Sequence, residues 1–214
     1  MTRRTSLAPS SSLSLTSAAL AGADSRRLAW GIRAALVLFM AVLTAAASQI
    51  SVPLWFTPVP FTLQPMVVLL GAALLGPRLG ALSQLLYLAA GMAGLPVFAA
   101  SPMLPQGPAR ILGPTGGYLM AYPAAAWVTG LLAEKGLDRR YLTAVAAMLA
   151  GLLVIFTGGV LWLATFTPAV EGDLLGALRI GFLPFILPDL LKVAFAATLL
   201  PAAWRLTGLG RRDV

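Results

Sequence analysis

Residues 141–164 read YLTAVAAMLAGLLVIFTGGVLWLA, a stretch without a single charged side chain. A helix needs roughly 20 apolar residues to cross a hydrocarbon core about 30 Å thick, so this stretch predicts a membrane-spanning helix. The whole chain has the same character, because 59% of its 214 residues are hydrophobic and only 10% are charged. A soluble domain carries about 25% charged residues. The sequence therefore predicts an all-α integral membrane protein.

Five further apolar stretches flank this one. The six predicted transmembrane helices cover residues 30–50, 61–76, 77–94, 115–133, 141–164 and 181–206. Together they form a predicted six-helix membrane domain over residues 28–206. Residues 51–60 contain three prolines, so the chain must leave the helix there. Residues 95–114 contain five prolines, and we interpret them as a structured, non-helical loop on the outer face.

The two ends of the chain differ from this membrane domain. Residues 1–27 are rich in Ser, Ala and Thr and predict a disordered cytoplasmic tail. Residues 207–214 predict a short basic cytoplasmic tail. A cleaved signal peptide is the alternative for the first segment, with Arg3 and Arg4 as its basic region, but serines interrupt the stretch that would have to be apolar.

The basic residues are distributed unequally between the two sides of the predicted membrane domain. If six spans alternate, only Arg110 and Arg179 lie on the outer side. The inner side holds twelve: Arg3, Arg4, Arg26, Arg27, Arg33, Arg78, Lys135, Arg139, Arg140, Arg205, Arg211 and Arg212. Cytoplasmic loops carry an excess of Lys and Arg, so both termini are predicted to be cytoplasmic, in a multi-pass protein of the cell (plasma or inner) membrane. The same distribution explains the net charge of +8 without nucleic-acid binding.

Several kinds of chemistry are excluded by composition. The chain has no Cys and no His, which removes disulfides, thiol nucleophiles, imidazole bases and the usual zinc sites. It also has no GxxxxGK[ST] loop to hold a nucleotide phosphate. We therefore expect a protein that is not an enzyme and has no metal or cofactor, and any ATPase that drives it must be another chain.

Two ionisable residues lie together in the sixth predicted span. Asp189 and Lys192 are three positions apart, which places them on one helix face. Arg205 at the inner boundary is 16 residues beyond Asp189, about 24 Å of helix, so the pair lies toward the outer half of the bilayer. Intramembrane charges are costly and usually face a cavity or serve a function. A purely structural ion pair that locks the helix to its neighbours is the alternative.

Three uncharged polar residues could join that pair. Gln84 and Tyr87 are three apart on one face of the third span, and Gln64 lies near the outer start of the second. Each alone is more often an interhelical hydrogen-bonding residue than a ligand contact, but together with an Asp and a Lys they could line one pocket. Tyr87 or Phe98 could cover an apolar ring of a ligand.

The first predicted span contains a pair of small residues four positions apart. Ala41 and Ala45 form a small-xxx-small pattern, which lets another helix approach closely. That helix could belong to a partner protein or to this same chain.

Several motifs resemble one transporter family in order and spacing. They are the segments Val59–Gln64 (VPFTLQ), Leu75–Gly80 (LGPRLG), Gly94–Phe98 (GLPVF), Gly113–Leu119 (GPTGGYL) and Pro188–Lys192 (PDLLK). Over about residues 35–200 the chain is similar to the BioY family, the biotin-specific S component of energy-coupling factor (ECF) transporters. The resemblance implies a six-helix membrane subunit that captures biotin from outside, with Asp189 and Lys192 at the ligand. It also implies a transmembrane coupling protein and ABC-type ATPases as partners, with Ala41 and Ala45 as the docking face.

The side-chain chemistry agrees with such a ligand. Biotin has a ureido group with two N–H donors and one acceptor, an apolar thioether ring and a carboxylate. Asp189 can accept hydrogen bonds from the N–H groups, and Lys192 can donate to the ureido oxygen or the carboxylate. An S component for another vitamin, a small intramembrane enzyme with Asp189 as base, and a channel or secondary carrier are the alternatives.

Overall fold

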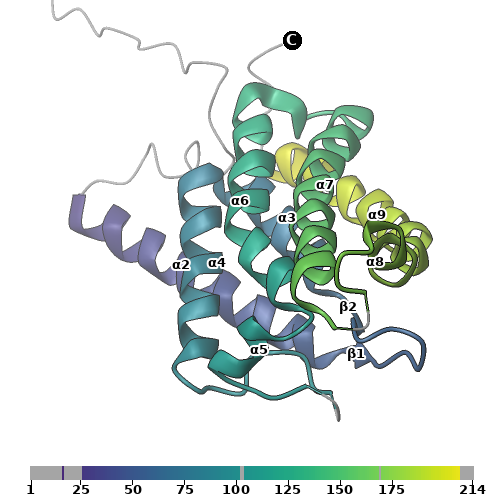
Figure 1. Cartoon of the computed structure of the whole chain (residues 1–214). Helices are drawn as coiled ribbons and strands as arrows, with labels where there is room; N and C mark the ends of the chain where they lie inside the picture. Colours follow the sequence, from purple (N-terminus) through teal and green to yellow (C-terminus); the bar gives the residue numbers. More distant parts are fainter. Residues whose placement is uncertain (1–15, 17–25, 102–103, 169, 208–214) are drawn as a thin grey trace, which may run out of the picture.

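The computed structural model describes residue 16 and residues 26–101, 104–168 and 170–207. The helices of this part are α2 (Arg26–Gln49), α3 (Gln64–Leu75), α4 (Pro77–Met92), α5 (Pro108–Leu112), α6 (Gly116–Leu132), α7 (Tyr141–Phe166), α8 (Leu174–Gly181) and α9 (Leu183–Thr207), with a π-helical turn η1 at Ala133–Leu137. They pack into one bundle in which α6 lies beside α3, α4 and α7, and α9 packs against α3 and α7 (Figure 1).

The predicted helices agree well with this arrangement. The segments 77–94, 115–133 and 141–164 match α4, α6 and α7 to within two residues at each end. The first span begins four residues earlier than expected, at Arg26, and the second begins three residues later, at Gln64. The predicted tails 1–27 and 207–214 lie almost wholly outside the described residues.

Helix lengths divide the bundle into two groups. In the described part, α2, α7 and α9 are long and apolar enough to cross a membrane. Helix α3 has 12 residues, α4 has 16 and α6 has 17. At 1.5 Å per residue, even α6 rises only about 26 Å, which is less than the roughly 30 Å of a hydrocarbon core. Length and composition therefore identify three spanning helices there.

A short strand pair closes the loop after α2. Strand β1 (Ser51–Val52) pairs antiparallel with β2 (Phe61–Thr62), with Ser51 opposite Thr62. These strands were not predicted from the sequence, because two residues are too few to show an alternating pattern. The pairing returns the proline-bearing segment 53–60 to the start of α3.

Two predicted loops contain short helices. The prediction that residues 95–114 are non-helical was wrong for Pro108–Leu112, which form α5. Proline is compatible with the first position of a helix, so Pro108 begins the helix instead of breaking it. In the loop after α7, Asp173 caps α8 by accepting a hydrogen bond from the N–H of Gly176 at 2.8 Å.

Glycines let α6 and α7 pack with their backbones close together. A Cβ atom placed on Gly117 would lie 2.4 Å from the carbonyl oxygen of Gly158, and one on Gly158 would lie 2.8 Å from Cβ of Ala121. Both distances are too short for a side chain, so the close contact depends on glycine. This contact fixes the first turn of α6 against α7.

The α6–α7 connection is tied to the C-terminal end of α9. Trp204 donates a hydrogen bond from Nε1 to Oδ2 of Asp138 at 2.7 Å, and both side chains are buried. The guanidinium carbon of Arg139 lies 5.1 Å from the centre of the Trp204 ring, in cation–π geometry. These contacts hold the C-terminal end of α9, whereas Asp189 lies near the N-terminal end of the same helix.

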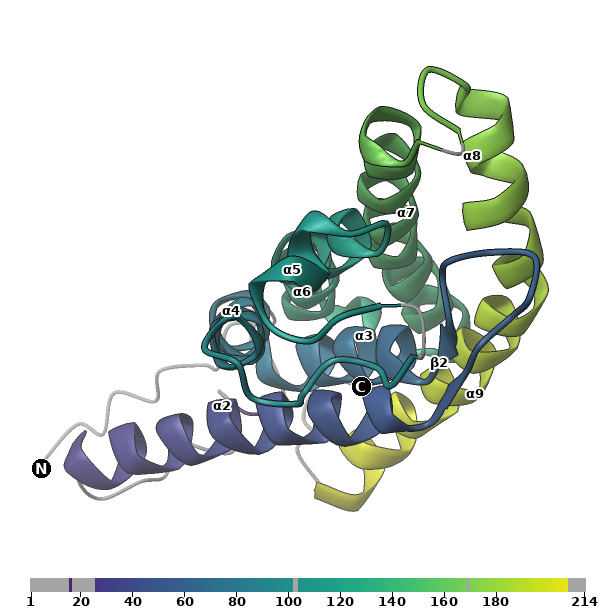
Figure 2. The same ribbon diagram turned by 60° about the horizontal axis from the view of Figure 1, so that its bottom comes forward.

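The N-terminal part of α2 extends beyond the other helices. Figure 2 shows this part projecting away from the bundle, while its C-terminal part runs beside α3 and α4. Trp30, Leu38 and Phe39 of α2 are exposed, although their side chains are large and apolar. A lipid environment accounts for such exposure in a spanning helix.

Candidate functional site

A cavity lies between α3, α6, α7 and α9, and residues 59, 60, 62, 98, 99 and 110 also line it. Its unfilled space is about 590 Å³, a volume that includes the open solvent at its mouth. The side chains that line it are Val59, Pro60, Thr62, Gln64, Pro65, Phe98, Ala99, Arg110, Thr115, Tyr118, Leu119, Tyr122, Ile155, Phe156, Phe185, Asp189 and Lys192. A few polar groups among mostly apolar walls are typical of a ligand site.

Asp189 and Lys192 lie side by side in this cavity. Nζ of Lys192 is 2.7 Å from Oδ1 of Asp189, and both residues are buried. The same ammonium donates to the carbonyl oxygen of Thr62 at 2.6 Å and lies 3.7 Å from the centre of the Phe61 ring. An ammonium has three N–H donors, and these two hydrogen bonds use two of them. Lys192 therefore links α9 to β2 as well as neutralising Asp189.

The second oxygen of Asp189 is differently placed. Oδ2 has no hydrogen-bond partner among the described residues, whereas Oδ1 is held by Lys192. Pro188 lies inside α9 directly before Asp189 and cannot donate a hydrogen bond to the preceding turn. The carboxylate thus keeps one free acceptor at an irregular point of the helix, where a ligand N–H could reach it.

Gln64, Tyr87 and Phe98 form one group beside this pair. Gln64 donates from Nε2 to Oη of Tyr87 at 2.7 Å, and Tyr87 packs edge-on against Phe98 with ring centres 5.6 Å apart. Gln64 and Phe98 line the cavity, whereas Tyr87 lies behind them and orients the amide. The structure thus brings these three predicted residues together, and their roles at a ligand stay predictions.

Gln84 lies away from the cavity. Its Nε2 is 3.2 Å from Oγ1 of Thr44 and 3.2 Å from Oγ of Ser83, between α2 and α4. It does not belong to the cavity lining. This position fits the interhelical hydrogen bond that the sequence left open as its alternative role.

The small residues of α2 also face this chain. Ala41 is buried in the main core, and Ala45 is half-buried against the same core. Ala41 therefore packs closely within this chain, which is one of the two possibilities for the pair. Contact of either residue with a partner protein stays a prediction.

Arg110 is a cavity residue that was not predicted from the sequence. It is 1% exposed, and its Nε donates to the carbonyl oxygen of Pro105 at 2.9 Å. Its Nη2 also donates to the carbonyl oxygen of Ala99. Burial lowers the pKa of Arg110, but an arginine of such high ordinary pKa stays charged at neutral pH. Within the described part of the chain it forms no ion pair, so it supplies a positive charge with no acidic partner.

The sequence carried one signal for Arg110. It is the only charged residue in the proline-rich segment 95–114. Its position in a predicted outer loop did not indicate that its side chain is buried. The irregular path of such a loop has no periodicity from which burial can be read. Thr115 and Tyr118 were noted as parts of a motif, but not as cavity residues.

Aromatic and aliphatic side chains close the remaining walls. Tyr118, Tyr122, Phe185 and Ile155 come from α6, α9 and α7. Tyr118 is fixed by a hydrogen bond from its hydroxyl to the carbonyl oxygen of Gly181 at 2.7 Å. The arrangement can hold a molecule with an apolar ring, N–H donors near Asp189 and an acidic group near Arg110.

Comparisons with known proteins show the family of this chain. The family model described as "BioY family" matches residues 18–208. The chain belongs to the BioY family. It is 45% identical over 173 residues to a probable biotin transporter BioY of Pyrococcus horikoshii, covering 81% of this chain and 94% of that protein. It is 41% identical over 161 residues to the biotin transporter BioY of Thermotoga maritima, covering 75% and 88%.

A solved structure shares the fold of this BioY family member. The crystal structure of the S-component for biotin from an ECF-type ABC transporter superposes with a TM-score of 0.73 at 26% sequence identity. The match covers 85% of this chain and 94% of the other. The resemblance inferred from short motifs is thus confirmed over nearly the whole chain.

Proposed function

We propose that this chain captures biotin with high affinity and takes it up as the substrate-specific membrane subunit of an ECF-type ABC transporter. The single observation that carries the proposal is the cavity in which Asp189, Gln64 and Arg110 meet apolar walls, in a chain whose relatives are named biotin transporters. The chain is a transport subunit and not an enzyme.

The polar groups of the cavity match the polar groups of biotin. Oδ2 of Asp189, free of other partners among the described residues, accepts from a ureido N–H. Gln64 holds its amide toward the same region through Tyr87 and can donate to the ureido oxygen. Phe185 and Tyr122 cover the thioether ring, and Arg110 balances the carboxylate at the end of the side chain.

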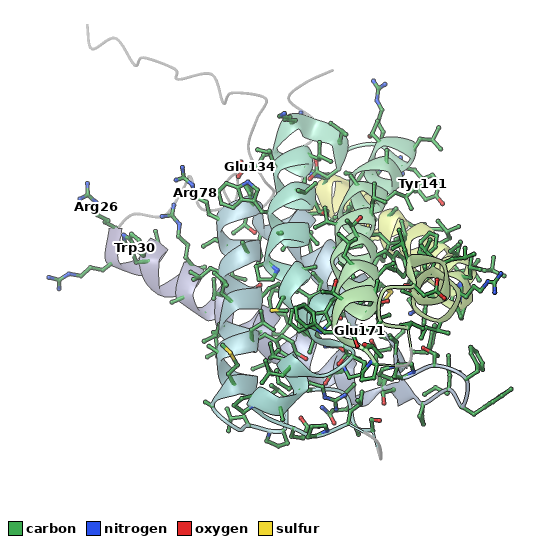
Figure 3. The ribbon with its side chains drawn as sticks, in the orientation of Figure 1. Arg26, Trp30, Arg78, Glu134, Tyr141 and Glu171 are labelled. Carbon is green, nitrogen blue, oxygen red and sulfur yellow. The ribbon has the colours of Figure 1, made fainter. Side chains whose placement is uncertain are left out.

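The proposed topology has six spans with both termini in the cytoplasm. Figure 3 supports it, because Arg26 at the start of α2, Arg78 at the start of α4 and Glu134 after α6 lie toward one end of the bundle, whereas Glu171 lies toward the other. The first end is the one that carries the excess of Arg and Lys, as expected on the cytoplasmic side of a plasma or inner membrane. The cavity then opens outward, where the vitamin arrives.

Energy for uptake comes from separate chains in this proposal. The sequence has no phosphate-binding loop, and the solved relative is a component of an ABC transporter. We propose a transmembrane coupling protein and ABC-type ATPases as the partners.

A binding experiment on the purified full-length chain tests the proposal. Isothermal titration with biotin, riboflavin and thiamine should give tight binding of biotin alone. Asp189→Asn keeps the shape but replaces an acceptor with a competing donor, and it should weaken biotin binding by about 1.5–3 kcal/mol, roughly ten- to a hundredfold. Preference for another vitamin would contradict the substrate, and chemical conversion of biotin would contradict the assignment as a transport subunit.

A further inference from the structure

The hydroxyl group of Thr115 is buried without a hydrogen-bond partner. Thr115 is 6% exposed and lines the cavity. No group in the described part of the chain forms a hydrogen bond with its Oγ1. Buried polar atoms in native proteins are nearly always satisfied, so an unpaired one at a cavity wall points to a partner that arrives with the ligand.

The helix itself does not use this hydroxyl. Thr115 is the N-cap residue of α6, a position where Thr usually accepts a hydrogen bond from the first turn. Its backbone angles of φ −89° and ψ −1° lie in the helical region instead of the extended region of a capping residue, and its side chain makes no capping hydrogen bond. The hydroxyl is therefore available to another molecule.

The first turn of α6 offers further donors beside it. Gly116 donates its N–H to Gly113, and Leu119 donates to Thr115, but the N–H groups of Gly117 and Tyr118 have no acceptor among the described residues. The start of a helix carries a partial positive charge and favours anions. This turn belongs to a helix of 17 residues, so the effect is fully developed.

The charged residues that line the cavity also favour an anion near Thr115 over one near Asp189. Arg110, five residues before Thr115, lines the same cavity and has no acidic partner in the described part of the chain. Asp189 on α9 would repel an anion. A ligand with an acidic end and a hydrogen-bond-donating end is therefore best bound with its acid toward Arg110 and Thr115.

We propose that the Thr115 hydroxyl and the first turn of α6 complete, with Arg110, a subsite for the carboxylate end of the ligand. This proposal rests on the proposed function and assigns the orientation of biotin. Thr115 is thereby a specificity-determining residue, which distinguishes the free acid from neutral derivatives of the same ring system.

Two substitutions and two ligands test it in the purified full-length chain. Thr115→Val removes the hydroxyl and keeps the branched shape, whereas Thr115→Ser keeps the hydroxyl. Titrations use biotin and biotinamide, in which a neutral carboxamide replaces the terminal carboxylate. Thr115→Val should weaken biotin binding about tenfold or more, the effect of losing a hydrogen bond to a charged group. It should change biotinamide binding by less than about threefold, and Thr115→Ser should stay within about threefold of the parent for both.

The outcomes separate this inference from the proposed function. Equal losses for both ligands, or unchanged biotin affinity in a Thr115→Val protein with the parent melting temperature, would overturn the acid subsite while leaving biotin binding intact. A parent protein that binds neither ligand would overturn the proposed function itself. Selective loss for the acid, with recovery in Thr115→Ser, supports the inference, because a merely structural role would affect both ligands alike.

Discussion

The ammonium of Lys192 lies 2.6 Å from the carbonyl oxygen of Thr62, a residue 130 positions earlier in the chain. The same group holds Asp189 at 2.7 Å. One side chain therefore fixes both the candidate ligand acceptor on α9 and the strand β2, which follows the proline-bearing segment 53–60. Lys192 acts first on the shape of the site, even though its charge suggests direct contact with a ligand.

Replacing Lys192 should lower both the stability of the fold and the affinity for biotin. Lys192→Met keeps the stem but leaves the Asp189 carboxylate buried without its counter-charge and β2 without its tether to α9. Removing one partner of a buried ion pair costs about 3–5 kcal/mol, so a large fall in both melting temperature and biotin affinity is expected. Thermal unfolding in detergent and isothermal titration measure the two effects separately. Unchanged stability would contradict the tethering role.

The double variant Asp189→Asn with Lys192→Met distinguishes a structural pair from a binding site. It leaves no lone charge, so expression and melting temperature should recover relative to Lys192→Met alone. Biotin affinity should stay as low as in the worse single variant, because the ureido acceptor is gone. Near-native affinity in this double variant would show that the pair only locks the helix.

Ala41 should be intolerant of a larger side chain in the isolated protein. Ala41→Leu adds atoms to a packed core, which typically costs about 1–3 kcal/mol. Ala46→Leu is the matched control, because Ala46 lies on the same helix but is exposed. A lower melting temperature for Ala41→Leu only is expected. Equal stability of the two variants would contradict the core assignment.

Ala45→Leu tests the partner contact at the half-buried residue of the pair. Biotin binding by the isolated chain should stay near the parent value, while ATP-dependent uptake by the assembled transporter falls. Small residues permit close helix approach, so a bulky one should weaken docking. Loss of binding together with uptake would instead show that Ala45 packs only within this chain.

The proposed topology can be checked with reporter fusions. A reporter joined after Lys135 and another after Arg212 should both report a cytoplasmic position, because each follows an even number of proposed spans. A reporter inserted within residues 95–114 should report the outer side. An external signal from either of the first two would contradict the six-span arrangement.

The parts predictable from sequence were those set by local geometry. Asp189 and Lys192 are three apart on one helix, so their contact follows from helix periodicity alone. The same rule placed Gln84 and Tyr87 on one face, but α2 packs against α4 at Gln84 while Tyr87 contacts Gln64. Which neighbour meets each residue is a tertiary property, and the sequence pattern does not encode it.

The parts that escaped prediction depend on the path of irregular segments. Hydrogen bonds to the carbonyl oxygens of Pro105 and Ala99 hold Arg110 inward, and no periodic pattern in the sequence signals such a turn. Thr115 was predicted as the start of a helix, but its unpaired hydroxyl is visible only once the hydrogen bonds around it are known.

The carboxyl group of Asp138 should make stability depend on pH. Burial raises its pKa from 3.8 to about 6, although the hydrogen bond from Trp204 acts in the opposite direction. Below about pH 4 the group is protonated in the folded and the unfolded chain alike, and its favourable contribution to folding is fully present. As the pH rises through about 6, the unfolded chain releases the proton more readily, and this contribution is lost.

Asp138→Asn removes the titration and keeps an oxygen that can accept the hydrogen bond from Trp204. The variant should therefore be more stable than the parent at pH 8, by at most about 3 kcal/mol for a shift of roughly two pKa units, and equally stable near pH 4. Thermal unfolding in detergent at both pH values measures this difference. Asp173→Asn serves as the control, because Asp173 is exposed and Asn caps a helix about as well as Asp, so little change is expected at either pH. If Asp138→Asn were less stable than the parent at pH 8, the ionised carboxylate would have to be stabilising, and the burial of Asp138 would not be the dominant influence on its pKa.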